Sequence, residues 1–353
     1  MNDLKRIVLI STGGTIASRW QGSGYAADAA GAEVLAGSAV PEGVRVEVVD
    51  LFNVNSSRMT TRRQLTLLRT VHEVLADPGV AGVVVTHGTD TLEETAFLLD
   101  LHHGDERPVV LTGAQQPYGT EGGDGPGNLC DALRTASSDT VRGLGVLVVF
   151  DGLVHAARGT LKAQTLAAEA FADPGAPPLG RVGFSRVDLY RRPLRPAPLP
   201  LPRAVYAPDY ADAELPRVDV LFHHTDGDPV LLRAALAAGA RGLVLVGTGA
   251  GNATPEYAQA VAEAVGRGVP VALSTRVAAG PVAEMYTGGG AVDLAAAGAV
   301  LGGTLRAGQL RIALVAALLA DAQEGADTAG LLASLVDPGA PGGGVRTDEA
   351  VAA

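Results

Sequence analysis

The chain has 353 residues, of which 47% are hydrophobic and 18% are charged, and its formal net charge is -11. This composition suits a folded protein of about two domains and excludes a disordered chain. An acidic chain repels phosphate backbones, so we expect no nucleic-acid partner. The single cysteine, Cys130, excludes an intramolecular disulfide. The N-terminus lacks the apolar segment of a signal peptide, and no run approaches the ~20 apolar residues of a membrane span. We therefore expect a soluble, cytoplasmic protein.

Short runs of branched apolar residues alternate with helical patterns over residues 1–190. The runs predict strands at Ile7–Ile10, Val44–Val49, Val80–Val85, Pro108–Leu111 and Leu144–Phe150, and the patterns between them predict helices at Thr61–Ala76, Thr91–His102 and Gly127–Ser138. Strands that are apolar at successive positions are typical of a sheet buried on both faces. Their alternation with helices predicts an α/β fold with a doubly wound, mostly parallel sheet.

The composition changes after residue 190. Residues 191–216 are proline-rich, which predicts an extended linker between domains. A smaller α/β domain is predicted at 217–335, with strands at Val218–Phe222, Gly242–Val246 and Val269–Leu273 and helices at Pro229–Ala238, Pro255–Gly266 and Arg306–Ala320. The last residues, 336–353, are rich in glycine and small side chains, and we expect a flexible tail there.

Polar turns follow four of the predicted strands of the first domain. They are Ser11–Ala17, Asn53–Met59, Thr86–Thr91 and Thr112–Gln116. Capping explains one such turn, because Thr, Gly and Asp favour turns and helix starts. Four of them are more than capping requires, and in an open parallel sheet the carboxyl ends of the strands form the ligand-binding edge. We therefore expect the functional site at this edge.

Threonine hydroxyls at this edge need a base before they can act as nucleophiles. His87 lies two residues from Thr89, but residues two apart in an extended turn point apart, so we expect His87 to make a structural hydrogen bond instead. Lys162 is one of only two lysines, with Lys5, and follows a predicted buried strand. A desolvated lysine can serve as a base. The alternative is that Lys162 is an ordinary surface lysine.

Several segments together resemble the signature motifs of bacterial-type L-asparaginases. They are TGGTIAS at Thr12–Ser18, THGTDTLEETA at Thr86–Ala96, the segment ending at Lys162, the Asn53–Met59 turn and GTGAGN at Gly247–Asn252, in matching order over most of the chain. The two threonine motifs, each after a predicted strand, make the match specific. The resemblance implies hydrolysis of the side-chain amide of L-asparagine through a threonine nucleophile, without metal or cofactor, in a homodimer or homotetramer. A side activity on L-glutamine stays open.

The resemblance also implies two catalytic clusters. In the first, Thr15 attacks the amide and is activated by Tyr25, which lies on a glycine-rich lid over residues 19–30. In the second, Thr89 and Lys162 shuttle protons or position water beside Asp90. Two threonines are thus candidates for the first nucleophile, and the sequence leaves that choice open.

The substrate contacts implied by the resemblance are with an amino acid. Asp90 is expected to pair with the substrate ammonium and Ser56 to bind its carboxylate. Ser57 stands where many relatives carry glutamine, so the preference between asparagine and glutamine is open. Backbone N–H groups at Thr89 and near Ala114 are expected to hold the oxyanion. In the second domain, Asn252 and Glu284 match residues that reach a neighbouring subunit's site, although Asn252 also fits the start of a helix.

Other functions fit these patterns less well. A dinucleotide-binding protein needs G-x-G-x-x-G after its first strand, and TGGTIA breaks that motif. The asparaginase-like subunit of a tRNA-dependent amidotransferase carries an extra domain ahead of its motif, which we do not expect here, and the acidic charge disfavours tRNA. A non-catalytic amino-acid-binding protein would not need Lys162. The seven histidines form no zinc-binding pattern, so we expect no metal.

Overall fold

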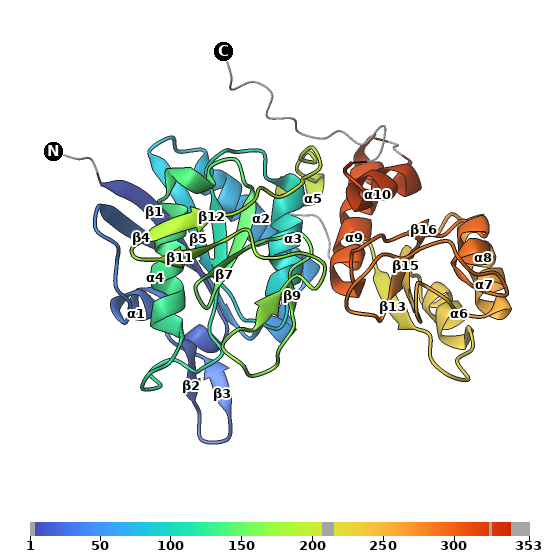
Figure 1. Cartoon of the computed structure of the whole chain (residues 1–353), viewed down its shortest axis with the longest axis horizontal. Helices are drawn as coiled ribbons and strands as arrows, with labels where there is room; N and C mark the ends of the chain where they lie inside the picture. Colours follow the sequence, from blue (N-terminus) through green and yellow to red (C-terminus); the bar gives the residue numbers. More distant parts are fainter. Residues whose placement is uncertain (1–3, 207–214, 325–326, 340–353) are drawn as a thin grey trace, which may run out of the picture. The chain divides into compact units, whose positions relative to one another are not determined.

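The computed structural model describes residues 4–206, 215–324 and 327–339. The chain forms two compact units, Met1–Pro193 and Leu194–Ala353, each of which is taken separately below (Figure 1). Residues 207–214 of the predicted linker and 340–353 of the predicted tail lie outside the described residues. No helix in the described part of the chain is both long and apolar enough to cross a membrane.

The first unit is built on an eight-stranded sheet with the order β12-β11-β8-β7-β6-β5-β1-β4. Its strands are β1 (Lys5–Gly13), β4 (Val44–Val54), β5 (Val80–Thr86), β6 (Val109–Thr112), β7 (Val146–Phe150), β8 (Leu153–Ala156), β11 (Gly180–Gly183) and β12 (Arg186–Leu189). The five neighbouring strands β4, β1, β5, β6 and β7 are parallel. The pairs β7–β8, β8–β11 and β11–β12 are antiparallel. This confirms the predicted α/β fold with a mostly parallel sheet.

The antiparallel edge was not predicted from the sequence, although a signal for it is present. Asp151 and Gly152 join β7 to β8 and have φ values of 49° and 71°. An Asp-Gly pair with both residues at positive φ is typical of a two-residue hairpin turn. This turn sends the chain back along β7 instead of through a crossover helix, and it starts the segment that carries Lys162.

Helices cover both faces of the large sheet (Figure 1). One face carries α1 (Gly31–Ala36) and α4 (Gly125–Ala136), and the other carries α2 (Thr61–Leu75) and α3 (Leu92–His102). On the first face, Leu129 and Leu133 of α4 pack in one buried cluster with Leu9, Val84 and Leu147 of the sheet. This dry core holds the parallel strands in register, so that their carboxyl ends lie at one edge.

Short elements beyond the predicted ones surround that edge. They are the 3-10 helices η1 (Thr15–Ala17) and η2 (Ser56–Arg58), the hairpin β2 (Ser18–Trp20) and β3 (Tyr25–Ala27), and the small sheet of β9 (Leu161–Lys162) and β10 (Phe171–Ala172); η3 (Asp139–Val141) lies elsewhere. The hairpin projects from the first unit (Figure 1). The Trp20 and Tyr25 rings pack edge-to-face with centroids 5.2 Å apart, so one aromatic pair stabilises the hairpin.

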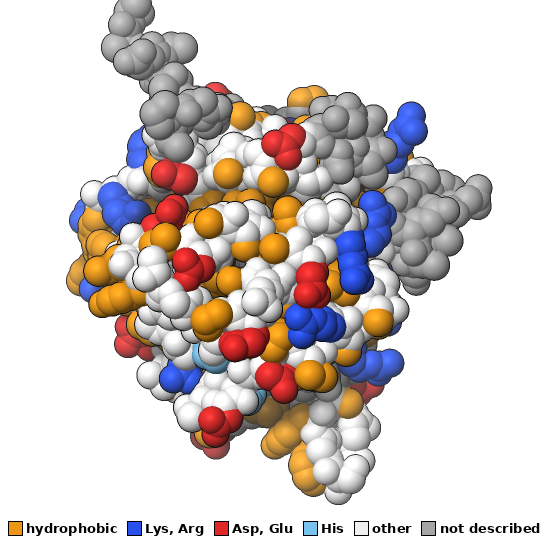
Figure 2. Space-filling view, turned by 90° about the vertical axis from the view of Figure 1, so that its right-hand side faces the viewer, with side chains coloured by type: hydrophobic (Ala, Val, Ile, Leu, Met, Phe, Trp, Pro, Cys, Tyr) orange, Lys and Arg blue, Asp and Glu red, His pale blue; other side chains and the backbone are white. Residues whose placement is uncertain are grey.

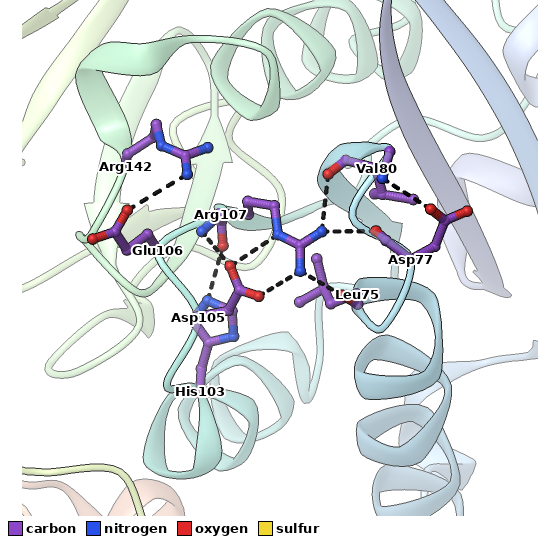
Figure 3. Close-up of polar contacts among 9 residues, drawn as sticks. Leu75, Asp77, Val80, His103, Asp105, Glu106, Arg107 and Arg142 are labelled. Atoms are coloured by element: carbon purple, nitrogen blue, oxygen red, sulfur yellow. Dashed lines mark hydrogen bonds and ion pairs between the residues drawn. The ribbon is translucent and has the colours of Figure 1, made fainter.

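Arg107 ties together the opposite, amino edge of the sheet (Figure 3). Its guanidinium donates to the carbonyls of Leu75, Asp77 (2.9 Å) and Val80 (3.0 Å) and to both carboxylate oxygens of Asp105 (2.5 and 2.9 Å). Hydrogen bonding with Arg107 lowers the pKa of Asp105 to about 2. A planar guanidinium with five donors suits this arrangement, which lysine cannot reproduce. Arg107 therefore joins the end of α2 to the starts of β5 and β6, far from the polar turns.

The second unit contains a four-stranded parallel sheet with the order β13-β14-β15-β16. Its elements are α5 (Arg203–Tyr206), β13 (Val218–Phe222), α6 (Val230–Ala237), β14 (Gly242–Gly247), α7 (Pro255–Gly266), β15 (Val271–Thr275), α8 (Ala291–Ala296), β16 (Val300–Leu301), α9 (Ala307–Glu324) and α10 (Thr328–Val336). The predicted smaller α/β domain is present, and α8, β16 and α10 add to it. On the face drawn in Figure 2, acidic and basic side chains are interspersed among apolar ones.

Candidate active site

The polar turns after β1, β4 and β5 meet backbone to backbone, and glycines make this approach possible. A Cβ added to Gly14 would lie 2.3 Å from the Cα of Gly88, and one added to Gly88 would lie 2.6 Å from the Oγ of Ser56. Gly14 also has a φ of 84°, which other residues rarely adopt. The glycines of the TGGTI and HGTDT motifs are therefore needed because the two turns touch each other.

A cleft of about 290 Å³ lies at this carboxyl edge. Six predicted site residues line it, namely Thr15, Tyr25, Ser56, Ser57, Thr89 and Asp90, and Gln115 lines it as well. Ala114 is buried and is not among the lining residues, whereas its neighbour Gln115 is. Four separate turns and the β2–β3 hairpin thus contribute to one cavity, as the edge rule for parallel sheets predicts.

Lys162 lies on β9 and points its ammonium at the turn after β5. Its Nζ donates to the Oγ1 of Thr89 at 2.7 Å and to the Oδ1 of Asp90 at 2.9 Å. The Lys162 side chain is 19% exposed, while that of Asp90 is 59% exposed. Lys162 is thus held between a threonine hydroxyl and a carboxylate, unlike a free surface lysine, and its part in the reaction stays a prediction. Asp90 keeps an open side on which a second cation can bind.

Ser56 holds the turn that carries Thr89. Its Oγ accepts a hydrogen bond from the backbone N–H of Asp90 at 3.1 Å, and its carbonyl accepts one from the hydroxyl of Thr91 at 2.9 Å. A serine that accepts through Oγ still has its own O–H to donate. Because Ser56 also lines the cleft, this proton is available to a ligand carboxylate.

Thr15 and Tyr25 approach the cleft from the turn after β1 and from the hairpin that follows it. Thr15 begins η1, and the hydroxyl of Ser18 bonds back to the carbonyl of Gly14 at 2.8 Å, which closes this short helical turn. Tyr25 is 55% exposed on β3. Arg19 of β2 pairs with Glu33 at 2.6 Å and connects the base of the hairpin to α1. The base of the hairpin is thus held, whereas nothing lies within 4 Å of a Cβ added to Gly22 or Gly24 at its tip.

Two titratable groups, one fully and one partly buried, flank the HGTDT turn without lining the cleft. His87 is fully buried, which lowers its pKa to about 4, and its Nδ1 lies 2.7 Å from the carbonyl of Gly88. It makes the structural hydrogen bond predicted for it. Burial raises the pKa of Glu93 to about 7, against the hydrogen bond that its carboxylate accepts from the backbone N–H of Lys162. The first turn of α3 therefore anchors β9.

Glu93 makes stability depend on pH in a direction that can be tested. Its folded pKa of about 7 lies above its ordinary value of 4.5, so the contribution of this carboxyl to stability is present below pH 4.5 and is lost as the pH rises towards 7. Glu93→Gln keeps an acceptor for Lys162 and removes the titration. We expect it to raise the free energy of unfolding by about 3 kcal/mol at about pH 8 and hardly at all at about pH 4.

Urea unfolding at the two pH values measures this difference. Glu42→Gln is the matched control, because Glu42 is an exposed carboxylate ahead of β4. An equal gain from Glu93→Gln at both pH values would show that the carboxyl titrates normally in the folded chain.

Asn252 and Glu284 belong to the second unit, which is described by itself. Asn252 sits in a tight turn after β14, where Thr248 N–H donates to its carbonyl at 2.8 Å, and its own N–H donates to the Thr248 carbonyl at 2.7 Å. Its Oδ1 is buried without a hydrogen-bond partner. Glu284 is exposed in the segment between β15 and α8. Their part in a neighbouring subunit's site stays a prediction.

Two residues beside the cleft were not singled out from the sequence. Gln115 follows β6, and Glu93 follows the HGTDT motif. Gln115 had a usable signal, since it stands in one of the four polar turns, whereas Glu93 looks like an ordinary acid in the first turn of a helix. Among the described residues, no three His, Cys, Asp or Glu side chains lie close enough together to hold a metal ion.

Comparison with known proteins identifies the family. Residues 6–195 match the family model "Asparaginase, N-terminal", and residues 217–328 match "Glutaminase/Asparaginase C-terminal domain". The chain is 37% identical to the L-asparaginase of Bacillus licheniformis over 91% of this chain and 97% of that protein, and 34% identical to a probable periplasmic L-asparaginase of Haemophilus influenzae over 90% and 89%. A crystal structure of a probable cytoplasmic L-asparaginase from Campylobacter jejuni superposes with a TM-score of 0.80 at 31% identity, covering 93% of this chain and 98% of that one. The chain therefore belongs to the asparaginase family and is an asparaginase-type amidohydrolase.

Proposed function

We propose that this protein hydrolyses L-asparagine to L-aspartate and ammonia through a threonine nucleophile. The observation that carries the proposal is the contact of the Lys162 ammonium with both the Thr89 hydroxyl and the Asp90 carboxylate, at 2.7 and 2.9 Å. A protein that only bound amino acids would need a carboxylate for the ammonium but no lysine against a hydroxyl. A proton-transfer group beside a hydroxyl is what hydrolysis requires.

The substrate is held at its amino-acid end by two groups. The exposed side of Asp90 pairs with the α-ammonium, and the free O–H of Ser56 donates to the α-carboxylate. With its amino-acid end held there, we expect the side-chain amide to face Thr15, which lines the same cleft. Ser57 is exposed and also lines the cleft, and its effect on the preference between asparagine and glutamine stays open.

The reaction then has two stages. The Thr15 oxygen attacks the amide carbon while its proton is relayed through the Tyr25 hydroxyl to the amide nitrogen, and the C–N bond then breaks as ammonia leaves. Water next attacks the ester carbon and its proton passes by way of the Thr89 hydroxyl to the neutral amine form of Lys162; the bond to the Thr15 oxygen breaks, that oxygen regains a proton, and L-aspartate leaves. Backbone N–H groups at Thr89 and near Ala114 hold the negative charge on the oxygen in both stages. Thr89 is the alternative first nucleophile, since it already contacts a lysine.

Ammonia release from purified protein tests the proposal. We expect L-asparagine to be hydrolysed faster than L-glutamine, with L-aspartate and ammonia formed in equal amounts. Because the proposed proton transfers use side chains alone, EDTA should leave the rate unchanged. A strict requirement for a divalent ion, or no release from either amide, would overturn the proposed mechanism.

We further propose that the β2–β3 hairpin is a lid, and its aromatic pair supplies the test. Trp20 is the single tryptophan of the chain and is 59% exposed against Tyr25. Closure over a bound amino acid would bury both rings and exclude water from Thr15. We expect saturating L-aspartate to shift the Trp20 emission to shorter wavelength, and Asp90→Ala to abolish the shift at the same concentration. Emission that is insensitive to the ligand in the unmodified protein would contradict closure.

Two further expectations remain predictions. The subunit arrangement, a homodimer or homotetramer in which Asn252 and Glu284 complete a neighbour's site, is one. The cytoplasmic location is the other, because the relatives include both a probable cytoplasmic and a probable periplasmic protein.

A further inference from the structure

The side chain of Gln115 connects the catalytic turn to the loop that follows Lys162. Its Oε1 accepts a hydrogen bond from the Thr89 hydroxyl at 3.2 Å. Its Nε2 donates to the carbonyls of Thr165 and Ala167, both at 3.1 Å. The backbone N–H of Gln115 is held separately by the carboxylate of Asp124 at 2.8 Å. Every polar group of this glutamine side chain is therefore used, and its main chain is fixed independently.

The orientation of the Gln115 amide follows from its partners. Two carbonyl oxygens can accept only, so the NH2 end must face them, and the oxygen must then face Thr89. The single proton of the Thr89 hydroxyl thus points at Gln115, which leaves the hydroxyl lone pairs facing the Nζ of Lys162 at 2.7 Å. Lys162, Thr89, Gln115 and the loop carbonyls form one continuous chain of donors and acceptors, in which each bond polarises the next.

The two hydrogen bonds of the Thr89 hydroxyl differ in length, and the longer one is the weaker. The contact between Lys162 and Thr89 is short at 2.7 Å, whereas that between Thr89 and Gln115, at 3.2 Å, is longer than the usual O–H···O range of about 2.5–3.0 Å. The Thr89 proton is therefore directed but weakly held, which suits a hydroxyl that must give up a proton during turnover. The two bonds to the loop fix the acceptor in place.

We propose that Gln115 is a positioning residue that, by accepting the Thr89 O–H, turns the lone pairs of that hydroxyl towards Lys162 and anchors the loop of residues 163–170 beside it. The catalytic part of this inference rests on the proposed hydrolysis of L-asparagine. The loop starts directly after Lys162 and is mostly exposed, with Leu166 at 86%. Gln115 therefore couples an exposed loop to the hydroxyl at the centre of the site.

Replacing Gln115 with methionine preserves length and removes all three hydrogen bonds. We expect kcat to fall roughly tenfold while the Kd for L-aspartate stays within about threefold, because Asp90 and Ser56 still bind the ligand. Gln116→Met is the matched control: the same substitution one position on, at an exposed side chain, should keep the unmodified kcat. Equal kcat values for the two variants would refute the orienting role.

Gln115→Glu separates orientation from simple packing. An ionised glutamate has no donor for the loop carbonyls, whereas a protonated one keeps a donor and an acceptor, as the amide does. We expect the kcat of this variant, relative to that of the unmodified protein, to rise as the pH falls, and the ratio for Gln115→Met to stay constant. A ratio for Gln115→Glu that does not change with pH would rule out the donor role.

Hydrogen exchange tests the loop anchor without reference to activity. Ala163 and Gln164 donate their N–H groups to the carbonyl of Ala170 at 2.8 and 3.2 Å, which closes the loop. Gln115→Met should speed exchange in the 163–170 peptide, and Gln116→Met should not. Faster exchange in a protein that releases no ammonia would reject the proposed function while supporting the anchor. Unchanged exchange in Gln115→Met would reject the anchor itself.

Discussion

Replacing Lys162 with methionine is expected to lower kcat for L-asparagine by roughly a hundredfold or more, the usual effect of losing a general base. Lys162 contacts Thr89 and the turn face of Asp90, whereas the outer side of Asp90 is exposed to the ligand. The Kd for L-aspartate, measured without turnover, should therefore change much less than kcat. Stopped-flow ammonia release and calorimetric titration measure the two quantities.

Lys5→Met is the control for this substitution, because Lys5 is the other lysine of the chain and lies at the amino end of β1. Asp90→Ala should instead raise the Kd for L-aspartate strongly, since the ligand ammonium loses the carboxylate that binds it. A Lys162→Met protein with near-normal kcat would remove Lys162 from the reaction.

Thr89→Val should resemble Lys162→Met, because the Thr89 hydroxyl and the Lys162 Nζ lie 2.7 Å apart and belong to one proton relay. Residues that work as a unit are strongly non-additive, so the double variant should be little slower than either single one. Effects that multiply in the double variant would mean that the two residues act in separate steps.

Replacing Gly14 with alanine is expected to destabilise the first unit and to inactivate it. The new Cβ would lie 2.3 Å from the Cα of Gly88, and backbone atoms cannot move aside as a flexible side chain can. Gly14 also has a φ of 84°. We expect a loss of roughly 3 kcal/mol or more in the free energy of unfolding, and a loss of activity because Thr15 is the next residue.

Gly43→Ala distinguishes collision from backbone strain. Gly43 has a similar φ of 78°, but nothing lies within 4 Å of an added Cβ. It should therefore cost only the conformational term, about 1–2 kcal/mol, and keep its activity. Urea unfolding and ammonia release for both variants make the comparison. Equal losses at the two positions would mean that the TGGTI and HGTDT turns do not press on each other.

Much of the site could be predicted from the sequence because local patterns mark it. Apolar runs predicted the parallel strands, and the edge rule then placed Thr15, Ser56 and Thr89 together at their carboxyl ends, where all three line one cleft. Lys162 stood out as one of only two lysines, and the resemblance grouped it with Asp90, which its Nζ contacts at 2.9 Å. These inferences depend on periodicity and on chain order, both of which can be read without coordinates.

Tertiary structure decided the features that depend on distant segments. Gly14, Gly88 and Ser56 are far apart in the chain. Only the register of β1, β4 and β5 brings Gly14 against Gly88 and Gly88 against Ser56, so that a Cβ added to either glycine would lie less than 3 Å from its neighbour. Gln115 acts through carbonyls of residues 165 and 167, about fifty positions later, and no local pattern marks a carbonyl as an acceptor. Glu93 lies in a helix start like many others, and it is chiefly desolvation in the folded chain, with a smaller contribution from Glu94, that raises its pKa. The sequence alone determined which elements form and which polar turns face the same edge, because propensity and periodicity are local. Which atoms touch there depends on how the sheet packs, because contact and desolvation are properties of the assembled core.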